Sequence, residues 1–136
     1  MSRPLIVVSM LVVLAGCERP DEAARTRALA ARALRGMLAY PQSTVLTIAA
    51  GDEAAQIVLT SSAPVRDIAG WYRKALALNG WELRSVREHN DSVTMYAERE
   101  GQPVWITLRP NAGGRGATYT LVGTIPTDSA RADSGR

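Results

Sequence analysis

A change of hydrophobic period at Gly80 constrains the fold of this chain more than any other feature of its sequence. From Trp81 to Ile125, apolar residues alternate with polar ones, which is the period of a β-strand that buries one face. Short turn segments interrupt the alternation, and strands joined by such short turns pair antiparallel. The pattern therefore predicts four consecutive antiparallel strands, over residues 81–87, 93–98, 104–109 and 117–125.

The residues before Gly80 predict a hairpin followed by a helix. Residues 44–50 and 56–60 are rich in strand formers, and the turn signal at Gly51 lies between them. A helix then opens at Pro64, because proline is favoured in the first helical turn. This helix carries one apolar face over three turns, and Gly80 supplies the left-handed residue that helix ends commonly need.

A further helix is expected nearer the N-terminus, from Asp21 to about Leu38. Alanine and arginine dominate this segment, and both are good helix formers. Tyr40-Pro41 ends it, since the residue before a proline is pushed out of helical geometry. The predicted fold class is therefore α+β: a two-layer sandwich with an antiparallel sheet of about six strands and one amphipathic helix packed on it, in the order helix-ββ-helix-ββββ, preceded by the N-terminal helix.

The first sixteen residues have the layout of an export signal. Arg3 gives a positively charged start, and an apolar run of twelve residues follows at 5–16. A helix needs about 20 apolar residues to cross the bilayer core, so this run is too short for a stable span. The run ends in Leu14-Ala15-Gly16-Cys17, which resembles the lipobox of bacterial lipoproteins at every position.

This resemblance implies cleavage between Gly16 and Cys17 and a diacylglyceryl group on the Cys17 sulfur. Two acyl chains hold a protein stably at a membrane, at about 0.8 kcal/mol per buried methylene. The alternative is an ordinary secretory signal with a cysteine nearby by chance. In some lipoproteins an aspartate after the cysteine directs the protein to the inner membrane. Glu18 stands there instead, which favours the periplasmic side of the outer membrane.

The expected organisation has four segments. They are a lipoprotein signal peptide at 1–16, a lipidated N-terminus with an Ala/Arg-rich helix at 17–39, an α+β domain at 40–126, and a disordered tail at 127–136. Cleavage before Cys17 leaves 120 residues, which is enough for one domain. Cys17 is the sole cysteine, so no internal disulfide can form.

The part of the chain after the signal resembles small bacterial envelope proteins of unknown function. The similarity covers roughly residues 40 to 125 and rests on three short motifs. They are Tyr40-Pro41 before a strand, Thr60-Ser61-Ser62-Ala63-Pro64-Val65 at a helix start, and Trp71-Tyr72-Arg73-Lys74-Ala75-Leu76 with Asn79-Gly80-Trp81 at the helix end. These motifs are structural in character and contain no catalytic residue.

The sequence contains no catalytic constellation, and we expect no enzyme, no metal and no cofactor. His89 is the sole histidine and lies in the hydrophilic turn Glu88-His89-Asn90-Asp91, whereas a catalytic triad needs its histidine held by a second group in a fixed pocket. Gly113-Gly114-Arg115-Gly116 resembles a phosphate-binding loop in composition alone. Such loops precede a helix N-terminus, and here an alternating strand follows.

The formal net charge of +3 is a mild excess, and no concentrated basic face of the kind that nucleic-acid binders carry is apparent. We therefore expect no nucleic-acid partner. Arg25, Arg32 and Arg35 form a strip beside the apolar face of the N-terminal helix. The strip is either a solvated helix face or a membrane-proximal basic face, where each residue contributes about 1 kcal/mol against anionic head groups.

The Glu100-Gly101 turn is expected to set Tyr96 opposite Trp105 on the sheet face that points away from the core. Three explanations for this aromatic pair are open. The rings stabilise the hairpin, at roughly 0.2–1 kcal/mol per cross-strand pair, or the N-terminal helix covers them, or a partner protein does.

The sequence as a whole favours a lipid-anchored envelope protein, membrane-associated through its anchor, that acts as a non-enzymatic scaffold or binds an envelope protein. The alternative is a module that holds a small apolar ligand between helix and sheet. Such a cavity requires an incompletely filled core, whereas Ile68, Trp71, Tyr72, Leu76 and Trp81 have the volume to fill it. The sequence specifies no oligomeric state.

Overall fold

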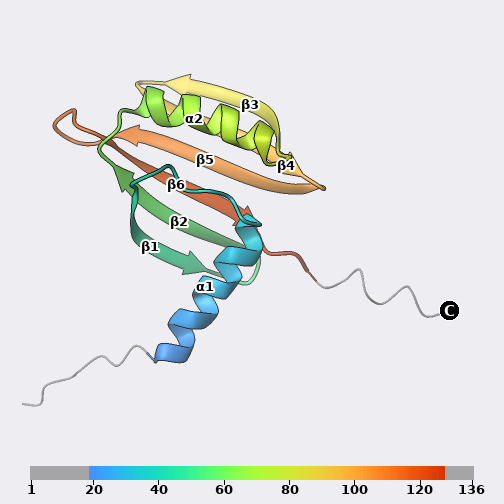
Figure 1. Cartoon of the computed structure of the whole chain (residues 1–136). Helices are drawn as coiled ribbons and strands as arrows, with labels where there is room; N and C mark the ends of the chain where they lie inside the picture. Colours follow the sequence, from blue (N-terminus) through green and yellow to red (C-terminus); the bar gives the residue numbers. More distant parts are fainter. Residues whose placement is uncertain (1–18, 128–136) are drawn as a thin grey trace, which may run out of the picture.

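The computed structural model describes residues 19–127, and every structural statement below refers to that part of the chain (Figure 1). Two helices and six strands follow one another in the predicted order, and each strand end lies within two residues of its expected position. The elements are α1 (Pro20–Leu34), β1 (Thr44–Ala50), β2 (Ala54–Ser61), α2 (Val65–Leu78), β3 (Glu82–His89), β4 (Ser92–Arg99), β5 (Gln102–Pro110) and β6 (Ala117–Thr124).

The six strands form one sheet in the order β1-β2-β6-β5-β4-β3, and every neighbouring pair is antiparallel. The β3–β4 and β4–β5 hairpins close through the two-residue turns Asn90-Asp91 and Glu100-Gly101. All four turn residues have positive φ, as in type I′ turns, whose twist matches that of the flanking strands. The second turn sets Tyr96 opposite Trp105, so the predicted register is confirmed.

Both helices pack on the same face of the sheet (Figure 1). Helix α1 contacts β1, β2 and β6, and helix α2 contacts β3, β4 and β5. Alternate side chains of the central strands point toward the helices and are buried. The largest completely or almost completely buried residues are Leu59, Ile68, Tyr72, Leu76, Met95, Val104, Ile106, Leu108, Tyr119 and Leu121.

The α+β two-layer architecture is thus as predicted, with one addition. The N-terminal helix α1 is a second member of the helical layer, because Ala30, Ala33 and Leu34 are buried against the sheet. The other side of the sheet has no helix on it, and we call it the open face.

The helix α1 ends at Leu34, four residues earlier than the sequence predicted. Arg35 adopts the left-handed conformation (φ 46°) and donates its backbone N–H to the Ala31 carbonyl, and Gly36 has φ 71°. The apolar spacing that continues to Leu38 was therefore misleading. After Arg35 the chain leaves the helix and runs over the helix-bearing side of the sheet to the start of β1 (Figure 1).

Buried aromatic residues fix this crossing segment between the helices. The Tyr72 hydroxyl donates to the Leu38 carbonyl at 2.9 Å, and the Tyr119 hydroxyl accepts from the Tyr40 N–H at 3.0 Å and donates to Ser43 Oγ at 2.6 Å. Tyr40 also meets Trp71 edge-to-face, with ring centroids 5.6 Å apart. The Tyr-Pro and Trp-Tyr motifs therefore have a packing explanation.

Arg99 joins the C-terminal ends of both helices to the end of β4. Its guanidinium donates to the Arg35 carbonyl after α1 and to the Asn79 carbonyl after α2. It also lies over the Trp81 ring, 4.7 Å from the centroid. A cation near the last carbonyls of a helix is stabilising because those groups carry partial negative charge.

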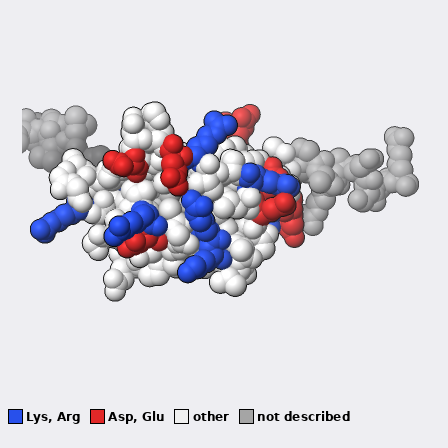
Figure 2. Space-filling view, turned by 90° about the horizontal axis from the view of Figure 1, so that it is seen from above, with Lys and Arg blue, Asp and Glu red and all other residues white. Residues whose placement is uncertain are grey.

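Charged side chains of both signs are intermingled on the side of the molecule that Figure 2 shows from above. On this side of the molecule lies β3, an edge strand of the sheet, which contains Glu82, Arg84, Arg87 and Glu88. Charges on an edge strand discourage pairing with other chains. The opposite edge strand, β1, has the uncharged sequence Thr-Val-Leu-Thr-Ile-Ala-Ala.

Candidate functional site

A hollow of about 640 Å³ lies at the N-terminal end of α2, where the helix, the β3–β4 turn and the β5–β6 loop surround it. We call it the α2 hollow. Ligand sites for small molecules typically measure about 300–1,000 Å³. The lining residues are Pro64, Val65, Arg66, Ala69, Gly70, Arg73, Glu88, His89, Asn90, Asp91, Ser92, Val93, Pro110, Gly114 and Gly116.

Of the five α2 residues that line the hollow, Ala69 has a small side chain and Gly70 has none. Ile68, Tyr72 and Leu76 follow one another at four-residue spacing along one face of α2, and they are completely buried and fill the space between helix and sheet. At the hollow, α2 instead presents Ala69 and Gly70. The sequence-based expectation of a filled core is therefore correct for Ile68, Tyr72 and Leu76, and the hollow lies beside these core residues, next to Ala69 and Gly70.

Gly70 is the most informative residue of the lining. Glycine inside a helix costs roughly 0.5–1 kcal/mol relative to alanine. No packing reason compels it here, because a Cβ atom at Gly70 would meet no atom within 4 Å and its φ is not positive. Gly70 is not among the site residues predicted from the sequence, although an isolated glycine inside a predicted helix is a visible signal.

Charged groups lie at the rim of the α2 hollow. Arg73 of α2 pairs with Glu88 of β3 at 3.4 Å, which links the helix to the sheet beside the hollow. Arg66 lies 3.5 Å from Asp67, and the His89 ring bonds to the Asn90 amide at 2.9 Å. About half of the lining residues are polar or charged and the others are apolar or glycine, a mixture that suits a ligand with an apolar body and a polar end.

The β5–β6 loop forms the third wall. Gly113, Gly114 and Gly116 all have positive φ, and a Cβ atom at Gly116 would lie 2.2 Å from the Ser61 carbonyl oxygen. Only glycine permits this close approach of the loop to the end of β2. Strand β6 follows the loop directly, so the loop is a hairpin connection and not the start of a helix.

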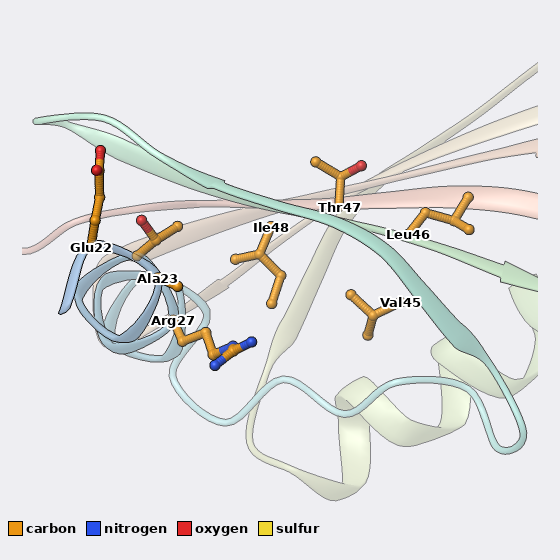
Figure 3. Close-up of a pocket in the computed structure, with 8 residues that line it drawn as sticks. Glu22, Ala23, Arg27, Val45, Leu46, Thr47 and Ile48 are labelled. Carbon is orange, nitrogen blue, oxygen red and sulfur yellow. The ribbon is translucent and has the colours of Figure 1, made fainter. Parts of the chain in front are cut away.

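A second depression of about 590 Å³ lies between α1 and the edge strand β1 (Figure 3). We call it the β1 groove. Val45 and Ile48 project from β1 on the side toward which Arg27 extends, whereas Thr47 projects from the opposite side (Figure 3). Val45 and Leu46 are 50% and 57% exposed. A β-bulge at Leu46 shifts the pairing with β2 here.

The aromatic pair predicted on the open face is present. The rings of Tyr96 and Trp105 lie with centroids 5.3 Å apart, and Trp105 is 38% exposed. The explanation that the N-terminal helix covers them is wrong, because α1 packs on the opposite face of the sheet. Tyr96 donates to Glu98, and this hydrogen bond raises the pKa of the phenol.

The other predicted site residues are placed as follows. Leu14, Ala15, Gly16 and Cys17 lie outside the described residues. Arg25 is exposed on α1. Arg35 follows the helix and pairs with Glu100 at 2.7 Å, so its guanidinium is held at the β4–β5 turn.

His89 is the last residue of β3, beside the Asn90-Asp91 turn. Between residues 19 and 127 there is no group of three or more acidic, histidine or cysteine side chains that could hold a metal. No helix in the same range is long and apolar enough to span a membrane.

Comparison with known proteins gives one match. A family model described as START domain-like matches residues 41–118, which are 78 of the 136 residues. No curated protein and no solved structure matches the chain. The matched range contains every lining residue of the α2 hollow, whereas the α1 side of the β1 groove lies outside it.

Proposed function

The chain belongs to the START domain-like family, and from this membership we propose that its folded part is a non-enzymatic module that binds a small, partly apolar molecule in the α2 hollow. The observation that supports this proposal best is the hollow itself. It has about 640 Å³ between α2, the β3–β4 turn and the β5–β6 loop, and it coincides with a helix glycine that packing does not require.

The sequence alone favoured a scaffold or protein-binding role over a ligand-binding module, and this proposal places ligand binding first. The sequence favoured a scaffold because the core residues of α2 are large enough to fill the layer. Ile68, Tyr72 and Leu76 do fill their part of it. The α2 hollow lies beside these residues, next to Ala69 and Gly70, and it offers a small ligand a site that composition alone did not indicate.

The proposal also includes a lipid anchor. Leu14-Ala15-Gly16-Cys17 closes an apolar run of signal-peptide length, which supports lipidation of Cys17. A module held by two acyl chains at the periplasmic side of the outer membrane would take up its ligand close to the bilayer.

Filling the hollow tests the ligand-binding function. Gly70→Leu places a branched side chain in open space, and Ala77→Leu adds the same side chain at an exposed position on the same helix, outside the hollow. The probe is the dye anilinonaphthalene sulfonate, whose fluorescence rises in an apolar site, with decanoate as the competitor. We expect saturable, decanoate-sensitive binding by the wild type and by Ala77→Leu, and its loss in Gly70→Leu.

Thermal unfolding of both variants provides the control, because Gly70→Leu should be at least as stable as the wild type. Dye binding that survives Gly70→Leu unchanged would exclude the α2 hollow as the site. Absence of saturable binding by the wild type would exclude the proposed function.

A partner protein is the second candidate, and one observation favours it. Strand β1 is an uncharged edge on which Val45 and Leu46 are half exposed, and such an edge can accept a strand from another chain. Leu46→Lys should then abolish copurification of that partner from membranes while leaving dye binding intact. Copurification unaffected by Leu46→Lys would remove this edge from consideration.

A further inference from the structure

We propose that one end of the open face binds a sugar that carries a single anionic group, either a phosphate or a carboxylate. The anionic group would lie in a polar depression of about 540 Å³ at the β3–β4 end of the sheet, and the sugar ring would lie toward Tyr96 and Trp105. We call this depression the basic corner. It is lined by Arg87, His89, Asn90, Ser92, Thr94, Thr107 and Arg109.

The basic corner contains cations and hydrogen-bond donors but no carboxylate. Arg87 comes from β3 and Arg109 from β5, on either side of β4, and both are exposed. Within residues 19–127 neither guanidinium has a hydrogen-bond or ion-pair partner. Arg87 is in the row of Thr94 and Thr107, and Arg109 is two residues beyond Thr107 along its strand. Strands lie about 4.8 Å apart and two residues cover about 7 Å, so these two long side chains start about 12 Å apart and can reach one anion between them.

The hydroxyls in the corner are neighbours by register. Arg87 pairs with Thr94, Thr94 pairs with Thr107, and His89 pairs with Ser92. All of these side chains share the open face, because Tyr96 and Trp105 continue the same alternation. Three hydroxyls beside two guanidinium groups therefore offer donors of the kind that phosphate or carboxylate oxygens accept.

The aromatic pair lies in the next row of the open face. Two residues along a strand cover about 7 Å, so Tyr96 and Trp105 are about one sugar ring away from Thr94 and Thr107. The C–H groups of a hexose pack against the negative face of an aromatic ring. Trp105 is 38% exposed and can offer such a surface.

Charge on the rest of the open face argues against a polyanion or a membrane as the occupant. Beyond Tyr96 lies Glu98, which pairs with Arg84 at 3.3 Å, and Glu82 pairs with the same arginine at 2.9 Å. A single-stranded nucleic acid needs a basic groove along its whole backbone. Only one end of this face is basic, which suits one terminal anionic group with a neutral ring behind it.

Titration calorimetry of the full chain tests this proposal with four probes: glucose 6-phosphate, glucuronate, glucose and inorganic phosphate. We expect one of the two anionic sugars to bind more tightly than both glucose and inorganic phosphate. Arg87→Gln with Arg109→Gln should weaken that binding by about tenfold or more, since hydrogen bonds to charged groups are among the stronger ones in proteins. Trp105→Thr should weaken binding of the sugar but not of inorganic phosphate.

Gly70→Leu serves as the matched control, because Gly70 lines the α2 hollow and not the basic corner. It should leave binding of the anionic sugar unchanged, so this proposal and the proposed function fail independently. Equal affinity for inorganic phosphate and the anionic sugars would overturn the proposal. Tighter binding of oligothymidylate or of anionic phospholipid vesicles would also overturn it, as would the absence of binding by either anionic sugar at millimolar concentration.

Discussion

Replacing Gly123 with alanine should push α1 away from the sheet and destabilise the domain. The backbone of α1 lies directly against β6 at this point. A Cβ atom at Gly123 would lie 2.3 Å from the carbonyl oxygen of Ala33 and 2.7 Å from its carbonyl carbon. Nonbonded heavy atoms are attractive only at about 3.5–4.0 Å, so α1 would have to move outward by about 1 Å. The obstacle is helix backbone, which cannot rotate away as a side chain can.

The size of the effect follows from what α1 buries. Overpacking of this kind typically costs about 1–3 kcal/mol. For a domain of this size, 1 kcal/mol lowers Tm by about 4–8 °C, so Gly123→Ala should lower Tm by at least about 4 °C. Ala30, Ala33 and Leu34 would lose part of their burial, and amide hydrogens of α1 should exchange faster than those of β4 and β5.

Gly70→Ala is the matched control, because its Cβ atom would meet nothing within 4 Å. We expect it to raise stability by about 0.4–1 kcal/mol. Thermal unfolding followed by circular dichroism measures both variants. A Gly123→Ala protein as stable as the wild type would refute the close packing of α1 on β6.

Three other predictions concern separate parts of the molecule. Burial, with a smaller contribution from Tyr119, raises the pKa of Tyr72 far above its ordinary value of 10.0. A raised pKa in the folded state means that this contribution to stability is complete below about pH 10 and decreases as the pH rises above it. Tyr72→Phe should cost about 1–3 kcal/mol at neutral pH, because the partly buried hydrogen bond to the Leu38 carbonyl is lost, and the cost should shrink above pH 10 in denaturation curves. A cost that stays constant with pH would contradict this account. Replacing Tyr96 and Trp105 together with threonine should cost at most about 1–2 kcal/mol in urea denaturation, because the rings lie on the open face, and a larger loss would indicate buried area that the structure does not show. Cys17→Ser should abolish incorporation of a labelled fatty acid in cells, and label retained on the serine variant would exclude Cys17 as the lipidated residue.

The alternating C-terminal half could be predicted from the sequence in detail. Two-residue turns with positive φ leave one register for each hairpin, so the pairing of Tyr96 with Trp105 followed from counting outward from Glu100-Gly101. The strand order was less accessible, because pairing of β2 with β6 joins residues more than fifty positions apart and no local pattern specifies it.

Three features of α1 and the hollow depended on tertiary contacts. The helix α1 ends at Leu34, and the next residue, Arg35, is held by Arg99 and Glu100 at the β4–β5 turn. The helix can pack closely on the sheet because Gly123 of β6 leaves room for its backbone. The α2 hollow depends on which side of the helix Gly70 occupies relative to the β3–β4 turn. The apolar spacing of the N-terminal helix therefore continued past its true end, and the composition of α2 indicated a filled core.

The central claim, that the α2 hollow binds a small partly apolar molecule, is tested most directly by nuclear magnetic resonance of the labelled full chain during titration with decanoate. The account predicts saturable shifts of backbone amides that cluster at residues 65–70, 88–93 and 110–116, the three segments that surround the hollow. Shifts centred on residues 22–27 and 45–48 would place the ligand in the β1 groove instead. Such a result, or an unchanged spectrum at saturating decanoate, would contradict the claim.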